Sequence, residues 1–233
     1  MARPVLLLTG IAEGLGAGMA RVFARAGHDV IGLSRSDRAS EHIKPLVEQS
    51  GGRYTHLACD ITRASEVAAA LEPHADKIGI LIHSAHMLAI KPFLATAIDE
   101  FEQAWRVTCL GAMISARAIL PHMVARGGGA IIFTGATAGL RGGANFSAFA
   151  AAKFALRGLA QSLAREFGPK GIHVAHVVLD GLIDEGQTDR RFGASPAGRM
   201  EPQAIAQAYL DLARQDVSAW THEMDLRPFS ERF

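Results

Sequence analysis

The chain has 233 residues, 49% of them apolar, which is enough to bury a sizeable core and fits one α/β domain better than two small ones. Its 24 Lys and Arg residues nearly balance 23 Asp and Glu, and the net charge of +1 gives no general attraction to nucleic acid or to an anionic membrane. No segment reaches about 18 uninterrupted apolar residues, and the first apolar run, residues 5–8, is too short for a signal peptide, so we expect a soluble, unprocessed cytoplasmic protein.

Short apolar runs alternate with longer helical patterns along the whole chain. The expected strands are residues 4–9, 29–34, 53–58, 78–83, 130–134, 172–178 and about 223–226, and the expected helices are 14–26, 39–50, 63–72, 98–126, 147–167 and about 202–214. Strands that are apolar on both faces and separated by helices predict a parallel sheet covered on both sides. The predicted fold is therefore α/β, a doubly wound, Rossmann-like domain of three α/β/α layers formed by residues 1–233. The loop-rich stretch at about 180–202 is a candidate substrate lid, although a plain surface crossover has the same composition.

A glycine-rich turn follows the first strand. The sequence TGIAEGLG contains Thr9, Gly10, Glu13, Gly14, Leu15 and Gly16, and a helix is expected to begin there. Glycines let the backbone turn sharply and approach a pyrophosphate, which the free N–H groups and dipole of the helix N-terminus then hold. A tight turn without a ligand can have the same sequence, but its place in the first β–α unit favours dinucleotide binding.

The ends of the second and third strands indicate which dinucleotide binds. Ser34 and Arg35 follow the second strand, where the adenosine ribose would lie, and an arginine there pairs with a 2′-phosphate. NADP is therefore favoured, with NAD still possible, while a solvated arginine explains the same residues without a ligand. Asp60, after the third strand, can accept a hydrogen bond from adenine or cap the next helix.

In this order and spacing, these segments resemble the short-chain dehydrogenase/reductase family over nearly the whole chain. The matching positions are TGIAEGLG, the pair Asp60-Ile61, Ala85 after the fourth strand, Gly111 in the long helix, and Lys153. The resemblance implies an oxidoreductase that moves a hydride between NADP(H) and the carbonyl or alcohol group of a small molecule, whose identity stays open. It also implies cofactor contacts from Ile61, Ser84, Ala85, Lys153 and Gly181.

The catalytic positions of that family are only partly retained. There, a tyrosine exchanges the substrate proton, a lysine four residues later lowers the tyrosine pKa and holds the ribose, a serine binds the carbonyl, and an asparagine anchors a relay water. Here the lysine is Lys153, but the tyrosine position is Phe149, the serine position Ala136 and the asparagine position Thr108. A general acid contributes about 10²- to 10⁴-fold to rate, so a catalytically inactive NADP-binding sensor or scaffold is the alternative reading. A Rossmann-like domain that binds no dinucleotide is a third.

Several residues are candidates to replace the missing groups, each with a structural explanation beside the functional one. They are the hydroxyls of Thr134 and Thr137, the imidazoles of His83 and His86, and the carboxylate of Asp180. Neither Tyr54 nor Tyr209 lies in the expected segment, so no relocated tyrosine is evident. Ser147 is expected to cap its helix.

A metal site is not favoured by the sequence. The pair His173 and His176 lies three residues apart on a strand, which points the two side chains to opposite faces. The only cysteines, Cys59 and Cys109, follow no metal-ligand or disulfide spacing.

The helix at 147–167 also bears on assembly. It is apolar or small on most of its circumference, with one polar line formed by Lys153, Arg157 and Gln161. A helix of this kind needs cover on two sides. In the family it resembles, this helix and the one at 98–126 pack against another subunit, which implies a homodimer or homotetramer; burial within one subunit is the alternative.

Overall fold

The structure is a computed structural model that describes residues 3–185 and 198–231. Seven parallel strands form one sheet in the order β3-β2-β1-β4-β5-β6-β7. The strands are β1 Val5–Thr9, β2 Asp29–Ser34, β3 Tyr54–Ala58, β4 Ile78–His83, β5 Gly129–Thr134, β6 Ile172–Leu179 and β7 Glu223–Leu226. The strand order reverses direction between β1 and β4, and ligands of open α/β sheets bind beside the carboxyl ends of the strands at such a point.

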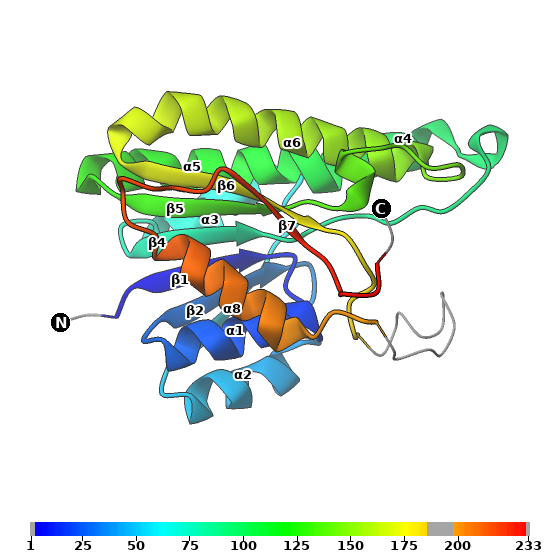
Figure 1. The fold of residues 1–233 in the computed structure, drawn as a ribbon. Coiled ribbons are helices and arrows are strands. Elements are labelled where there is room, and N and C mark those ends of the chain that lie inside the picture. The colour runs from blue at the N-terminus through cyan, green and yellow to red at the C-terminus, as the bar shows by residue number, and fades with distance from the viewer. Residues whose placement is uncertain (1–2, 186–197, 232–233) are drawn as a thin grey trace.

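Helices cover both faces of this sheet, which confirms the predicted doubly wound α/β class. The α-helices are α1 Leu15–Arg25, α2 Ser40–Gln49, α3 Ala64–Leu71, α4 Ile98–Trp105, α5 Gly111–Arg126, α6 Ser147–Phe167 and α8 Pro202–Ala213, and the short 3₁₀ turns are Glu72–His74, Phe93–Ala95, Thr137–Gly139 and Gly168–Lys170. The helices α1, α2 and α8 lie on one face, and α3, α5 and α6 on the other (Figure 1). Because side chains alternate along a strand, Leu6 and Leu8 pack toward the first group of helices and Leu7 toward the second.

The segment expected as one helix at 98–126 is not a regular α-helix throughout. A π-helical turn, Arg106–Leu110, joins α4 to α5. Just after it, Gly111 packs against Ile61, whose Cδ1 would lie 2.7 Å from a Cβ at position 111. The whole stretch 98–126 has the length and hydropathy of a membrane span, but half of its most apolar window is buried inside the protein, as in a core helix.

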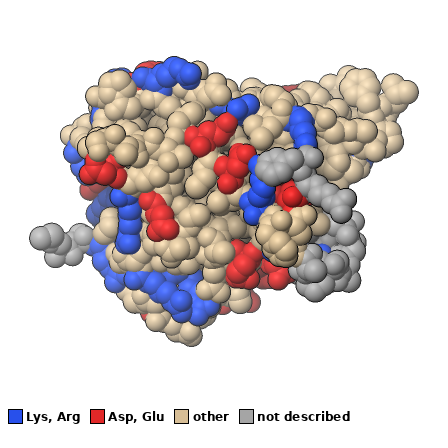
Figure 2. Space-filling view, in the orientation of Figure 1, with Lys and Arg blue, Asp and Glu red and all other residues tan. Residues whose placement is uncertain are grey.

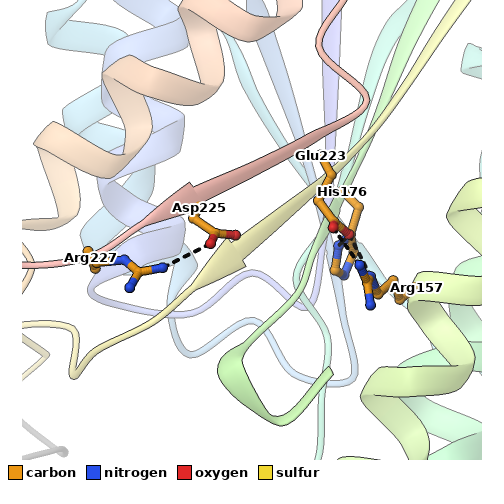
Figure 3. Close-up of polar contacts among 5 residues, drawn as sticks. All are labelled: Arg157, His176, Glu223, Asp225 and Arg227. Atoms are coloured by element: carbon orange, nitrogen blue, oxygen red, sulfur yellow. Dashed lines mark hydrogen bonds and ion pairs between the residues drawn. The ribbon is translucent and has the colours of Figure 1, made fainter. Parts of the chain in front are cut away.

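The last strand is fastened to α6 by a polar cluster. Arg157 donates to both carboxylate oxygens of Glu223, at 2.7 and 2.6 Å, and His176 Nδ1 lies 3.0 Å from the same carboxylate (Figure 3). On the same strand, Asp225 pairs with Arg227 at 2.9 Å. The strand predicted at about 223–226 is therefore confirmed as β7, which forms one edge of the sheet and ties it to the helix that carries Lys153.

The cap predicted for α6 is wrong, and the candidate lid lies partly outside the described residues. The prediction that Ser147 caps α6 is wrong, because Phe146 is the N-cap and the buried Ser147 Oγ has no hydrogen-bond partner. Of the candidate lid at about 180–202, residues 186–197 lie outside the described residues. On either side of them, Ile183 and Met200 pair in a short parallel bridge.

Candidate active site

A cleft of about 680 Å³ lies at the carboxyl edge of the sheet, where β1, β4, β5 and β6 end. Its volume falls in the range of small-molecule sites, about 300–1,000 Å³. The residues named from sequence that line it are Gly10, Glu13, Leu15, Gly16, Ser84, His86, Thr134, Ala136, Thr137, Phe149, Lys153, Asp180 and Gly181. The fold therefore brings the glycine-rich turn and the altered catalytic segment to one cavity, although they are far apart in sequence.

The glycine-rich turn is closed by the segment after β4. Gly10 has a φ of +74°, and a Cβ there would lie 2.4 Å from the Ala85 Cα, so only glycine fits. Behind the turn, the fully buried Thr9 hydroxyl lies 2.7 Å from His83 Nδ1. The turn is thus held rigidly in front of the N-terminus of α1.

The residues expected around adenosine lie at the ends of β2 and β3, outside the lining of the cleft. Arg35 is exposed, and the Ser34 hydroxyl donates to Ser36 O at 2.9 Å. Burial alone would raise the pKa of Asp60, but hydrogen bonds from Thr62 lower it overall. Because α3 begins later, with Arg63 as N-cap, Asp60 holds the turn before the helix rather than capping it. Its contact with adenine stays a prediction.

Lys153 is buried beside an apolar ring. Its ammonium donates to Thr134 O at 2.7 Å and lies 5.6 Å from the centroid of Phe149. Burial lowers the pKa of Lys153 to about 7. The Phe149 ring also contacts the His86 ring edge to face, with centroids 5.9 Å apart. At the position of the family's tyrosine there is thus no proton donor, while the lysine beside it titrates near neutral pH.

A series of hydrogen-bonded hydroxyl groups leads to the cleft from α8, which lies on the face of the sheet opposite α6. The fully buried Tyr209 on α8 donates to Thr134 Oγ1 at 3.1 Å, and Thr134 Oγ1 lies 2.8 Å from Ser84 Oγ. Either hydroxyl can donate in the Thr134–Ser84 pair, and donation from Thr134 leaves the Ser84 proton for the cleft. The sequence did not suggest this role for Tyr209, since it lies 75 positions from Thr134 and in a different layer.

Three other residues considered as catalytic groups are engaged elsewhere or lie outside the cleft. Both nitrogens of the fully buried His83 have partners, Thr9 Oγ1 and Thr108 O, and burial lowers the pKa of His83 to about 3. Thr108 is also fully buried and does not line the cleft. Thr137 lines it but donates its proton to Asp180 Oδ1. The suggestion of His83 as an acid is therefore wrong, whereas the suggestion of Thr137 as a carbonyl donor stays a prediction.

Sequence reasoning missed Glu185, which follows β6. Its Oε1 accepts a hydrogen bond from Leu15 N, the first residue of α1, at 2.8 Å. Burial raises the pKa of Glu185, although the bond from Leu15 N works against that rise. No periodicity could reveal this contact, because it joins a loop residue to a helix 170 positions earlier.

The histidine pair considered as a metal site has other partners. His173 Nε2 lies 2.9 Å from Thr221 O, and its ring stacks on Trp220 with centroids 4.9 Å apart. Within residues 3–185 and 198–231, no group of three or more His, Cys, Asp or Glu side chains is arranged to hold a metal ion.

Comparison with known proteins links this architecture to one family. The family model described as short chain dehydrogenase matches residues 4–190. The carbonyl reductase family member 4 of Danio rerio is 29% identical over 215 residues, covering 87% of this chain and 88% of that protein. The crystal structure of a short-chain dehydrogenase from Rhodopseudomonas palustris is similar with a TM-score of 0.85 and 35% identity, covering 98% of this chain and 100% of that one. A metagenomic short-chain oxidoreductase in complex with NADP is similar with a TM-score of 0.84 and 25% identity, covering 98% of both chains.

Proposed function

Because the chain belongs to the short-chain dehydrogenase family, we propose that it is an oxidoreductase that transfers a hydride between NADP(H) and the carbonyl or alcohol group of a small molecule. The observation that carries this proposal is the shared cleft, which joins the glycine-rich turn to Ser84 and Lys153. The turn suits a dinucleotide phosphate, and the other two residues can act on a substrate oxygen.

A nicotinamide dinucleotide would supply or accept the hydride in this cleft. The tight turn at Gly10 and the N-terminus of α1 would form a cradle for its pyrophosphate, and the turn keeps its shape only with glycine, because a Cβ at position 10 would collide with Ala85. The exposed Arg35 supports NADP over NAD, because its guanidinium can pair with the 2′-phosphate. The metagenomic relative solved with NADP agrees with this choice.

Ser84 and Lys153, which both form hydrogen bonds with Thr134, act on the substrate oxygen in different ways. Ser84 Oγ donates a hydrogen bond that polarises the carbonyl, a role that Ala136 cannot fill. The carbonyl carbon takes the hydride, its π electrons move to oxygen, and that oxygen takes a proton from Lys153 Nζ, which solvent then replaces. A pKa near 7 suits such a general acid at neutral pH.

The lining of the cleft favours an apolar substrate. Leu88, Phe149, Leu182 and Ile183 face it, and Phe149 removes the polar group that the family has at that position. We therefore expect aromatic or alkyl aldehydes and ketones to bind better than polyols.

We also propose a cytoplasmic homodimer or homotetramer built through residues 98–126 and 147–167. The face of the α4 corner drawn in Figure 2 shows few charged side chains, and Phe93, Ile98 and Trp105 are exposed apolar side chains in or beside α4. The charged side chains of this region include the ion pairs Lys91–Glu100 and Arg106–Glu102. A groove of about 450 Å³ between α5 and α6 is lined by Leu120, Leu163 and other apolar residues. Light scattering at the monomer mass would contradict this assembly.

The function is tested by restoring the family's catalytic groups. Purified protein is titrated with NADPH and assayed on a panel of aldehydes, ketones and quinones, alongside Phe149→Tyr combined with Ala136→Ser. We expect NADPH binding and slow turnover in the native protein, and a rise of about tenfold or more in the double variant. Phe154→Tyr is the control, because it adds a phenol at a half-exposed position of the same helix.

The outcomes separate the possible functions. NADPH binding without turnover in either protein would identify a non-catalytic NADP-binding protein. Activity that falls in the double variant would show that Phe149 and Ala136 serve a different chemistry. No NADPH binding at all would contradict both functions.

A further inference from the structure

We propose that Glu185 is an autoinhibitory side chain, which occupies the phosphate-binding end of α1 and must leave it before NADP(H) binds. This proposal rests on the proposed function, since it concerns the same cofactor site. It assigns a regulatory role to a residue that takes no part in the chemistry.

The contact replaces a helix cap that the sequence does not supply nearby. The first N–H groups of a helix have no partner within the helix, and a side chain at the N-cap position normally satisfies one of them. Here the N-cap is Gly14, which has no side chain to do so. Glu185 Oε1 takes the N–H of Leu15 instead, at 2.8 Å. A carboxylate at this end of α1 also interacts favourably with the helix dipole.

A cofactor pyrophosphate needs the same place. Its oxygens would approach the N–H groups at the start of α1, and its negative charge cannot share that position with a carboxylate. The packing is tight as well, because a Cβ at Gly14 would lie 2.5 Å from Glu185 Cγ. Glu185 must therefore rotate away from Leu15, or lose its charge, when the phosphates arrive.

The other charged groups of the cleft do not remove this conflict. Its lining includes the carboxylates of Glu13, Asp180 and Glu231 and the basic side chains of Arg141, His86 and Lys153. Among these, Asp180 accepts from Thr137 and Lys153 donates to Thr134 O. Leu15 N donates its hydrogen bond to Glu185.

Burial makes this contact sensitive to pH. The pKa of Glu185 is raised by burial, and the hydrogen bond from Leu15 N opposes the rise. Glu185 therefore takes up a proton at a higher pH than an exposed glutamate would. A neutral carboxyl is a weaker acceptor and does not repel phosphate. Lowering the pH should release the start of α1.

The size of the effect follows from competition. When the binding-competent state is only a fraction of the population, the apparent dissociation constant rises by the inverse of that fraction. A charge-assisted hydrogen bond to a backbone N–H is strong enough to hold about nine molecules in ten in the closed state. Native protein should then bind NADPH about tenfold more weakly than protein without the carboxylate.

The experiment compares NADPH binding in four proteins by the change in NADPH fluorescence. Glu185→Gln removes the charge at constant size, and Glu185→Ala removes the side chain. Asp184→Asn is the matched control, because it removes an exposed carboxylate one residue away. We expect both Glu185 variants to lower the dissociation constant about tenfold and the control to change it less than about twofold.

A second experiment measures the NADPH dissociation constants at several pH values. The ratio of dissociation constants between native protein and Glu185→Gln should be largest at alkaline pH and decrease toward one as the pH is lowered and Glu185 takes up a proton. Titration of the ligand's own phosphate cancels in this ratio, because both proteins bind the same NADPH.

Each alternative result has a distinct meaning. Equal dissociation constants in native protein and both Glu185 variants would overturn the inhibitory role and leave the proposed function intact. Weaker binding in Glu185→Ala would overturn it too, by showing that Glu185 helps to hold the cofactor. NADPH binding by none of the four proteins would overturn the proposed function, and this inference with it.

Discussion

At the scale of single residues, Thr134 forms hydrogen bonds with three other residues of the candidate site. Its carbonyl oxygen accepts from Lys153, and its hydroxyl lies between Tyr209 and Ser84. The phenol donates to Thr134, and we infer that Thr134 in turn donates to Ser84, although either hydroxyl of that pair can be the donor. Tyr209 is therefore a positioning residue, which aims the Ser84 proton without touching the substrate.

Removing the phenol hydroxyl tests this order. In Tyr209→Phe, the Thr134 proton no longer has one preferred direction, so Ser84 is free to donate back to Thr134 instead of to the substrate. We expect kcat for the best substrate of the carbonyl panel to fall about tenfold, with KM and the NADPH dissociation constant little changed.

The control for that variant is Tyr54→Phe, which removes another partly buried phenol hydroxyl, one that has only long contacts of 3.4 Å to Ser40 and His56. A uniform loss of kcat in both variants, or none in Tyr209→Phe, would show that Tyr209 serves packing alone.

At the scale of elements, α6 connects the candidate site to the end of the sheet. Lys153 faces the cleft, and Arg157, one turn later, holds Glu223 on β7. The hydrogen bond from Arg157 is the main reason that the pKa of Glu223 is lowered. Because the pKa of Glu223 is lower in the folded protein than in the unfolded chain, its ionised carboxylate stabilises the fold at pH values above the usual glutamate pKa. This stabilisation is lost as the pH falls through the lowered pKa.

Glu223→Gln tests this link between α6 and β7. It leaves Arg157 and the fully buried His176 without a charged partner, and we expect the free energy of unfolding at pH 7 to fall by about 1–3 kcal/mol in urea titrations. The matched variant Glu102→Gln breaks an exposed ion pair with Arg106 and should change it by less than about 0.5 kcal/mol. Similar small losses in both variants would contradict a structural role for the cluster.

The elements themselves were largely predictable, whereas the contacts between distant residues were not. Strands such as 78–83 and helices such as 147–167 follow from hydrophobic periodicity, which depends only on neighbours in the chain. The glycine-rich turn and Lys153 followed from the family resemblance. The π-helical turn, the Tyr209 phenol and the Glu185 contact depend on packing between residues far apart, and no local pattern encodes them.

At the scale of the whole molecule, buried histidines make the fold sensitive to acid. Burial lowers the pKa of His28, His173 and His176, and that of His83 to about 3. The unfolded chain takes up protons at these residues below about pH 6.5, whereas the folded protein takes them up only at lower pH. Stability is therefore lost as the pH falls below that value.

The expected loss can be measured by urea unfolding at several pH values. His83 alone should lower the free energy of unfolding by about 2 kcal/mol between pH 7 and pH 5, and the other three histidines should add to it. A free energy that stays constant between these two pH values would contradict this view of the buried histidines.

The parallel sheet also has a consequence for how the chain reaches its native state. Every neighbouring pair of strands in the sheet is parallel, and the residues paired between its strands that are closest along the chain, such as Val5 with Asp29 and Val30 with Tyr54, are 24 positions apart. Within residues 3–185 and 198–231, no hairpin is available to nucleate the sheet locally, and each pairing of sheet strands must first close a long loop. Folding should therefore be slow. During that time the apolar strands are exposed, and strands of different chains can associate and aggregate. Dilution or a chaperone should then raise the yield of refolding.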